Sequence, residues 1–366
     1  MNARYFKRGM SGAGGGRRLA APGALLLGAA LAAPPAAAHH SRAMFDAARP
    51  VKLEGTVAKE TWRNPHVYFE ITVAGESGAV AGTWTLEGGS VAGMVQSGWV
   101  ESTLGIGDVV SVEIAPHKDP QRRYASLISV TVADGTRYES FTPGAASRAN
   151  APSTERSADL SGTWNRVDAT NRGGAVGNEA VAGPTHWPLT ERGRRQAEAF
   201  ATADDPMFRC VFYGVPRLAA SVYSRRFSRS AERIVIEQEQ YPLTRTIWLD
   251  GRPMPADFEP SALGFSSGRF EADGTLLVET TGFSYTPWGS SAGLDSSDRK
   301  LVVERYKLSR DGLKLDYSHT LVDPEFLTAP VVESFSYEKI GDREYVFETC
   351  DVDSARRPLQ YAEPVR

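Results

Sequence analysis

The sequence is poor in several features that often reveal a function. It contains only 2 cysteines in 366 residues, which excludes a cysteine-rich scaffold and a zinc centre built from several cysteines. It also lacks the Walker phosphate loop and the G-x-G-x-x-G dinucleotide fingerprint. Composition and motifs therefore leave the catalytic class open, and whether the protein is an enzyme is an open question at this stage.

Acidic residues are absent from the first 45 positions, where five basic residues precede an apolar, small-residue stretch and Ala36-Ala37-Ala38. A charged segment, an apolar segment and an A-x-A site form the layout of a secretory signal peptide. We expect residues 1–38 to be that signal and the mature protein to be periplasmic or secreted. The alternative is an uncleaved membrane anchor, because Leu19 to Ala38 just reaches spanning length.

A strong positive charge is also missing from the rest of the chain. Without the five basic residues of the signal, 36 basic residues remain against 44 acidic ones, a formal charge of −8. An acidic protein with no basic run is a poor partner for nucleic acid. No later apolar run reaches spanning length, so no membrane association is expected after cleavage.

The two cysteines, Cys210 and Cys350, predict a single disulfide in an oxidising compartment. Closing so long a loop would stabilise the fold by about 4–5 kcal/mol on the chain-entropy model. A metal-bound or catalytic thiol is the alternative, although neither cysteine lies in a C-x-x-C motif or beside a histidine.

The patterning predicts two mainly β domains. Residues 142–158 are rich in Pro, Ala, Ser and Gly, which is typical of a linker. Residues 39–141 before it contain five strand-like segments with a helical one between the third and fourth. This is the strand and helix count of an OB-type barrel.

Residues 159–366 contain six segments rich in Val, Ile, Thr, Tyr and Phe. The pairs Asp250-Gly251, Asp273-Gly274 and Asp311-Gly312 between such segments each predict a hairpin turn. Only Thr190 to Thr202 is expected to be helical, with Thr190 as the N-cap. The pattern predicts an antiparallel barrel or sandwich.

Separated motifs in the first domain carry a resemblance. They are His39-His40-Ser41, Met44-Phe45-Asp46, Asn64-Pro65-His66-Val67 and Trp84-Thr85-Leu86-Glu87-Gly88-Gly89. Residues 39–138 resemble an exported bacterial family known as domain of unknown function 6152. That resemblance implies export and no particular activity.

The second domain resembles another uncharacterised family of secreted bacterial proteins. The motifs include Asp159-Leu160-Ser161-Gly162-Thr163-Trp164, Gly214-Val215-Pro216-Arg217, Leu249-Asp250-Gly251-Arg252-Pro253 and Leu277-Val278-Glu279-Thr280-Thr281-Gly282-Phe283. This resemblance implies a lipocalin-like barrel for residues 159–366. The chain departs from the pattern at Trp288-Gly289-Ser290, where such proteins tend to have Trp-x-Asp.

Histidines suggest one alternative function, a copper-binding protein. A mature chain that begins with His39-His40 offers an amine and an imidazole to one metal ion, a combination that favours copper. His66, in the Asn-Pro-His turn, would complete the site if it lies near them. A solvated terminus and a strand-edge histidine explain the same residues without a metal.

A hydrolase or lyase is the second alternative. His319 lies in the predicted strand Leu313 to Val322, where it points either into a barrel or into water. It would act as a general base if it is buried near Asp323, Glu304 or Glu279. A structural histidine explains the same position.

Aromatic residues suggest the leading hypothesis, an exported binding protein for a small apolar molecule. Trp248, Phe265, Phe283 and Trp288 lie in segments expected to line or cap the barrel, and ligand pockets have mostly apolar walls. Core packing explains these residues equally well.

Overall fold

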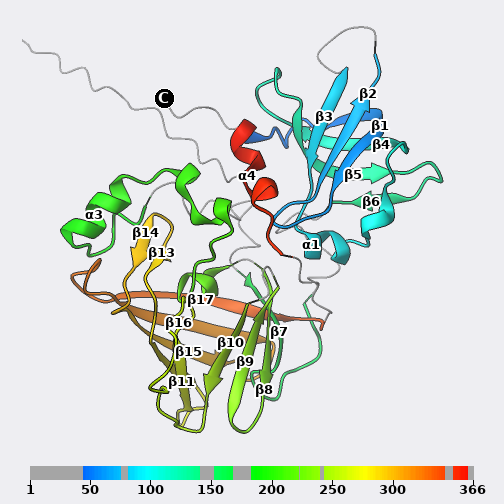
Figure 1. The fold of residues 1–366 in the computed structure, drawn as a ribbon. Helices are drawn as coiled ribbons and strands as arrows, with labels where there is room; N and C mark the ends of the chain where they lie inside the picture. Colours follow the sequence, from blue (N-terminus) through cyan, green and yellow to red (C-terminus); the bar gives the residue numbers. More distant parts are fainter. Residues whose placement is uncertain are drawn as a thin grey trace, which may run out of the picture. The chain divides into compact units, whose positions relative to one another are not determined.

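The computed structural model describes residues 44–75, 81–140, 152–167, 183–221, 223–239, 243–342 and 349–361. By backbone contacts, residues 36–366 form one compact unit, which contains all of the described residues. The architecture is mainly β, with a small barrel followed by a larger one (Figure 1).

Five strands form the first barrel, and a sixth short strand extends it. β1 pairs with β2 and β4, β2 with β3, β4 with β5, and a parallel β3–β5 pairing closes the cylinder. The described elements are β1 (Val51–Thr61), β2 (Tyr68–Val73), β3 (Gly82–Glu87), α1 (Val91–Gln96), β4 (Val109–Pro116), β5 (Tyr124–Thr131) and β6 (Arg137–Glu139). The helix lies between the third and fourth strands, which confirms the predicted OB-like count.

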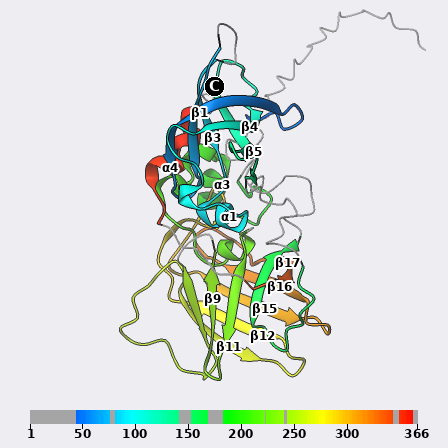
Figure 2. The ribbon, with the colours of Figure 1, turned by 90° about the vertical axis from the view of Figure 1, so that its right-hand side faces the viewer.

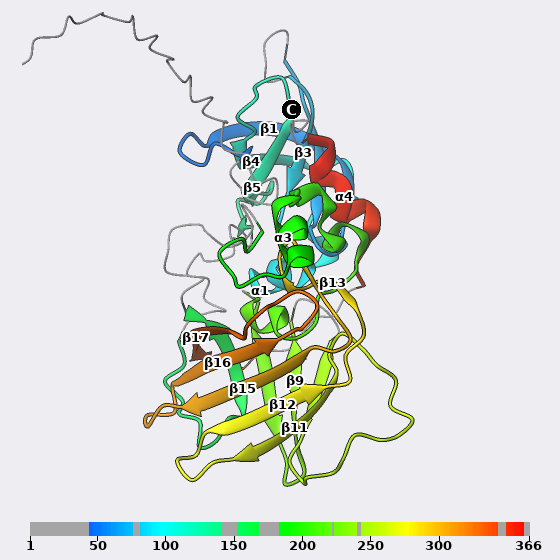
Figure 3. The ribbon, with the colours of Figure 1, turned by 90° about the vertical axis from the view of Figure 1, so that its left-hand side faces the viewer.

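Nine strands close the second barrel, in the order β10-β11-β12-β15-β16-β17-β7-β8-β9. Figure 2 and Figure 3 show its wall from two opposite sides. The strands are β7 (Gly162–Arg166), β8 (Arg225–Arg229), β9 (Arg233–Gln238), β10 (Thr244–Trp248), β11 (Phe265–Phe270), β12 (Leu276–Thr281), β15 (Leu301–Leu308), β16 (Lys314–Val322) and β17 (Val331–Ile340).

One of the three predicted hairpin turns is wrong. Asp273-Gly274 and Asp311-Gly312 join antiparallel neighbours as expected. Asp250-Gly251 does not, because β10 and β11 pair in parallel and parallel neighbours need a longer connection than a two-residue turn. The chain crosses over through residues 249–264 instead.

An apolar cluster fills one end of the second barrel. Trp164, Phe227, Ile247 and Leu315 are each at most 1% exposed. They occupy the inward positions of their strands, where alternation puts every second side chain inside.

The other end of the second barrel is covered by a cap. It contains α3 (Glu191–Glu198), the hairpin of β13 (Thr286–Ser291) with β14 (Leu294–Ser296), and the short 3-10 helices η5 (Thr202–Asp204), η6 (Pro206–Arg209) and η7 (Arg217–Ala220). Thr190 caps α3 as predicted, since its side chain accepts a hydrogen bond from the Gly193 amide. Cap residues such as Trp187 and Leu294 pack with Val302 of the barrel.

The final helix, α4 (Val352–Tyr361), follows the second barrel but packs on the first, where Tyr361 stacks on Tyr124. The predicted disulfide is confirmed: Cys210 and Cys350 are bonded, with Cα atoms 5.8 Å apart. It joins the end of η6 to the residue two places before α4.

Candidate functional site

A polar layer crosses the interior of the second barrel above its apolar end. Strand alternation points Arg245 of β10, Thr280 of β12 and Glu304 of β15 into this layer, and all three are at most 6% exposed. Arg245 forms a buried ion pair with Glu304 and donates to Thr280 Oγ1 at 2.9 Å. Its Nε donates to Ser266 Oγ at 3.0 Å.

Glu304 is fully engaged as a carboxylate. Beyond the two bonds from Arg245, the hydroxyls of Tyr306 and Tyr317 donate to Oε1 at 2.9 and 3.1 Å. Burial is the largest single effect and would raise the pKa of Glu304, but the charge and hydrogen bonds of Arg245, with the hydrogen bond from Tyr306 and the effect of His319, together hold the pKa below its usual value. Glu304 therefore stays ionised and organises its neighbours rather than transferring a proton.

Arg225 of β8 has a different set of partners. It is 2% exposed, and Nη1 donates to the Ala219 carbonyl at 2.5 Å and to the Tyr337 hydroxyl at 2.6 Å. Nη2 donates to the Ser221 carbonyl at 2.6 Å, while Nε has no hydrogen-bond partner. In the described part of the chain, Arg225 has no carboxylate partner, unlike Arg226, which pairs with Glu237.

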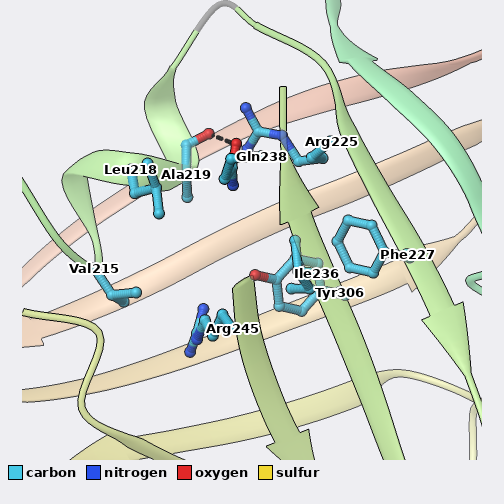
Figure 4. Close-up of a pocket in the computed structure, with 9 residues that line it drawn as sticks. All are labelled: Val215, Leu218, Ala219, Arg225, Phe227, Ile236, Gln238, Arg245 and Tyr306. Atoms are coloured by element: carbon cyan, nitrogen blue, oxygen red, sulfur yellow. Dashed lines mark hydrogen bonds between the residues drawn. The ribbon is translucent and has the colours of Figure 1, made fainter. Parts of the chain in front are cut away.

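Arg225 and Arg245 line a pocket that Figure 4 shows in close-up. Gln238, the cross-strand neighbour of Arg225, lines it too, and its Oε1 has no hydrogen-bond partner in the part of the chain that the structure describes. The remaining lining residues are mostly apolar: Val215, Leu218, Ala219, Phe227, Ile236 and Tyr306. The volume open to the centre of a water molecule is about 10 Å³, which is room for roughly one water.

One wall of this pocket is not a strand. Val215, Leu218 and Ala219 belong to residues 214–221, which we call the 214–221 loop. At its base, a Cβ on Gly214 would lie 1.7 Å from the Ala262 carbonyl oxygen, so only glycine fits there. The loop therefore depends on a close backbone contact at its start.

Buried and half-buried basic side chains hold the carbonyl groups of the 214–221 loop. Besides Arg225, Lys300 Nζ donates to the Val215 carbonyl at 2.6 Å and Arg166 Nη1 donates to the Ala220 carbonyl at 2.7 Å. Burial lowers the pKa of Lys300 to about 7, against a smaller opposing effect of Asp323. Three basic side chains thus hold the backbone carbonyls of the 214–221 loop.

The structure brings His319 and Glu304 together but leaves Asp323 elsewhere. His319 is the cross-strand neighbour of Glu304 and is 2% exposed, so it points into the barrel. Burial lowers the pKa of His319 to about 4, so its ring is neutral near pH 7. Asp323 instead accepts from the amide and hydroxyl of Ser297 at 2.7 Å, a turn-stabilising role. Acid–base catalysis by His319 stays a prediction.

The four predicted ligand-binding aromatics do not form one wall. Trp248 stacks under the guanidinium of Arg252, whose Cζ lies 3.7 Å from the ring centre. Its neighbour in the strand, Ile247, is the residue that faces inward. Phe265 packs edge-on against Phe258. The other two belong to the cap region, where Phe283 lies 4.1 Å from Lys300 Nζ and Trp288 stacks with Phe200. None of the four lines the pocket next to Arg225.

The predicted copper ligands are only partly visible. His39 and His40 lie outside the described residues. His66 is present, with Nδ1 3.5 Å from Glu87 Oε1 and a side chain 33% exposed. Across the described ranges, no three residues among His, Cys, Asp and Glu cluster closely enough to hold a metal ion. The copper site therefore stays a prediction.

The G-x-S-x-G pattern of a nucleophile elbow occurs twice, at residues 264–268 and 289–293. Both central serines, Ser266 and Ser291, lie in strands, β11 and β13. A nucleophile elbow requires a sharp strand-to-helix turn. Neither serine has that setting, and Ser266 Oγ is bonded to Arg245 and Thr280.

Comparison with known proteins gives one match. Residues 28–125 match a family of unknown function, DUF6152, which supports the resemblance seen in the first domain. No curated protein and no solved structure matches. None of the described helices has the length and apolar character needed to cross a membrane.

Sequence reasoning missed Arg225 and Gln238. Their strands read Arg-Arg-Phe-Ser-Arg and Arg-Ile-Val-Ile-Glu-Gln. In β9 the inward positions Ile234 and Ile236 are followed at the same spacing by Gln238, so the alternation predicts that this amide points inward. Strand β8 has too few apolar residues to be recognised as a strand from its sequence, so the inward position of Arg225 could not be predicted.

Proposed function

We propose that this protein is an exported binding protein that holds a small apolar molecule bearing an anionic group. The ligand site is the pocket between the 214–221 loop and strands β8, β9 and β10 of the second barrel. The observation that carries the proposal is Arg225, a buried guanidinium that lines a pocket and has no carboxylate partner among the described residues. A carboxylate or similar anion is the natural complement of such a group.

The walls define the rest of the ligand. Leu218, Phe227 and Ile236 offer an apolar surface for its body, and Gln238 offers an acceptor, Oε1, that has no donor among the described residues. Small-molecule sites usually have mostly apolar walls with a few polar groups. A ligand with an anionic group at one end and an apolar body at the other matches this distribution.

The ligand enters by displacing the 214–221 loop. Space for about one water is too little for an organic ligand, and the other walls are hydrogen-bonded barrel strands. The carbonyls of Ala219 and Ser221 occupy donors of Arg225 in the closed state. An incoming anion replaces these neutral acceptors with a charged one, which forms stronger hydrogen bonds and offsets the cost of opening.

Export is part of the same proposal. The basic and apolar N-terminal sequence has the layout of a signal peptide, and the single disulfide suits an oxidising compartment. Membership of residues 159–366 in a second secreted family, with a lipocalin-like ligand role, is likewise proposed on the motifs quoted above.

A pair of probes with the same apolar tail tests the ligand chemistry. Isothermal calorimetry on the mature protein compares octanoate with 1-octanol, which lacks the charge. We expect octanoate to bind about 10- to 100-fold more tightly, the range for one hydrogen-bonded charge. Equal affinity for the two probes, or no binding of octanoate, contradicts the proposal.

A further inference from the structure

The outer face of the first barrel carries a second, separate cluster of aromatic and polar groups. Tyr68 of β2, Thr85 and Glu87 of β3, and Tyr124 of β5 lie on neighbouring strands and form cross-strand pairs. Tyr68 and Tyr124 are at most 1% exposed. The Tyr124 hydroxyl is hydrogen-bonded to the Glu87 carboxylate. We call these four residues the tyrosine face.

Helix α4 covers the tyrosine face with one inserted ring. The rings of Tyr361 and Tyr124 are stacked with centroids 4.0 Å apart and planes 11° apart. The Tyr361 hydroxyl lies 3.2 Å from Thr85 Oγ1. Aromatic side chains in proteins more often meet edge-on or offset at 4.5–7 Å. This close parallel contact resembles that of a planar aromatic ligand stacked on a protein ring.

Other contacts of α4 surround the inserted ring. Ser354 Oγ donates to the His66 carbonyl at 2.8 Å, and the Tyr68 hydroxyl lies 3.3 Å from the Ser354 carbonyl. The guanidinium of Arg357 lies 4.5 Å from the centre of the Tyr68 ring. These contacts hold the helix across the face, while Tyr361 itself fills it.

The sequence motifs of the first domain converge at this place. Asn64-Pro65-His66 and Glu87-Gly88-Gly89 come from separate segments, yet His66 Nδ1 lies 3.5 Å from Glu87 Oε1. The family match, residues 28–125, contains the whole tyrosine face and no part of α4. The face thus belongs to the matched module, and its cover comes from a distant part of the chain.

We propose that the tyrosine face is a binding site for a small phenolic ring and that Tyr361 occupies it as a built-in competitor. A phenol fits because the site offers a stacking platform, the Tyr124 ring, and a hydroxyl partner, Thr85. A ligand gains access when α4 withdraws. The proposal is independent of the pocket next to Arg225.

The first test empties the site in the full chain with Tyr361→Ala. The probe is 4-methylphenol, the isolated ring of tyrosine, and toluene is its counterpart without a hydroxyl. We expect one 4-methylphenol to bind per chain, about 5- to 10-fold more tightly than toluene, as one net hydrogen bond provides. An ordinary apolar hole prefers toluene, and that preference, or no binding by the folded variant, overturns the proposal.

Phe200→Ala is the matched control for hole filling. Phe200 stacks on Trp288 in the cap of the second barrel with centroids 5.3 Å apart, so its removal also leaves a space beside a ring face. We expect no preference for 4-methylphenol over toluene there. An equal preference in both variants would show that phenol binds wherever a stacked ring is removed. The tyrosine face would then not be a specific site, and the proposal would fail.

The second test uses the unaltered protein, so that a folding defect of the variant cannot obscure the answer. Saturating 4-methylphenol should accelerate amide hydrogen exchange in residues 352–361 and slow it in β2 and β3, because ligand and helix compete for one face. Unchanged exchange in α4 would mean that the ligand does not displace this helix, and the proposal would fail.

Discussion

Arg225 Nη1 donates a 2.6 Å hydrogen bond to the Tyr337 hydroxyl, which in turn lies 2.8 Å from the Ala219 carbonyl that Arg225 also binds. The three groups form a closed triangle in which a buried cation is surrounded by neutral oxygen atoms. Burying a charge without a counter-charge is expensive, and natural proteins accept such a cost at functional sites more often than elsewhere. This relationship is the basis of the proposed anion site.

The ion pair between Arg245 and Glu304 should be essential for stability. Glu304→Gln leaves a buried guanidinium without its counter-charge and should lower the free energy of unfolding by about 3–5 kcal/mol. Urea denaturation followed by tryptophan fluorescence measures it. The matched control is Arg305→Gln, which breaks the exposed pair with Glu271 on the opposite side of β15 and should cost about 0–1 kcal/mol. Similar losses in the two variants would contradict the assigned role.

The contribution of His319 to stability should fall as the pH is lowered from 6.5 to about 4. The pKa of His319 is lowered by burial from 6.5 in the unfolded chain to about 4 in the fold, so between these values the unfolded state binds a proton that the native state does not. Linkage then makes this contribution complete above pH 6.5 and progressively lost below it. The full loss is on the order of 3 kcal/mol, from about 1.4 kcal/mol per pKa unit.

A comparison of variants isolates the effect of His319. His319→Leu should flatten the dependence of unfolding free energy on pH in this window, whereas replacing the exposed His186 by Gln should not. Glu60 contributes with the opposite sign, since burial and Glu101 raise its pKa to about 7. That contribution is shared by all variants and cancels in the comparison. An unchanged slope for His319→Leu would show that His319 is protonated in the fold.

Loss of the disulfide should weaken the molecule substantially. Cys210 and Cys350 are 140 residues apart, and removing such a cross-link should cost about 4–5 kcal/mol on the chain-entropy model. Thermal unfolding of the double Cys→Ser variant measures it, with the reduced wild-type protein as the control. A cost below about 1 kcal/mol would mean that the unfolded chain is not constrained as that model assumes.

Strand alternation made much of the fold predictable. In β16 the inward residues Leu315, Tyr317, His319 and Leu321 alternate with more exposed ones. The strand predicted from this alternation, Leu313 to Val322, differs from the observed one by one residue. Helix α4 was missed because it contains Pro358, which ordinarily breaks a helix. Here tertiary contacts with the first barrel compensate for it.

The site was harder to predict, because it depends on which residues share a layer inside the barrel. The sequence left open which acid, if any, lies near His319, and the structure pairs it with Glu304 across β15 and β16. Arg225 escaped notice because an arginine in a short polar segment usually lies on the surface. The pairing of β8 with β9 brings it beside Gln238, but its contact with Tyr337 of β17 depends on the strand order β17-β7-β8.

The most direct test of the central claim compares two adjacent arginines of β8. Arg225→Gln and Arg226→Gln remove the same charge one residue apart, but Arg225 lines the pocket and Arg226 pairs with Glu237 on the outside. Calorimetric titration with octanoate should show affinity reduced about 10- to 100-fold in Arg225→Gln, the value of one charged hydrogen bond, and unchanged in Arg226→Gln. Equal octanoate affinity in the two variants, both folded, would contradict an anion site at Arg225.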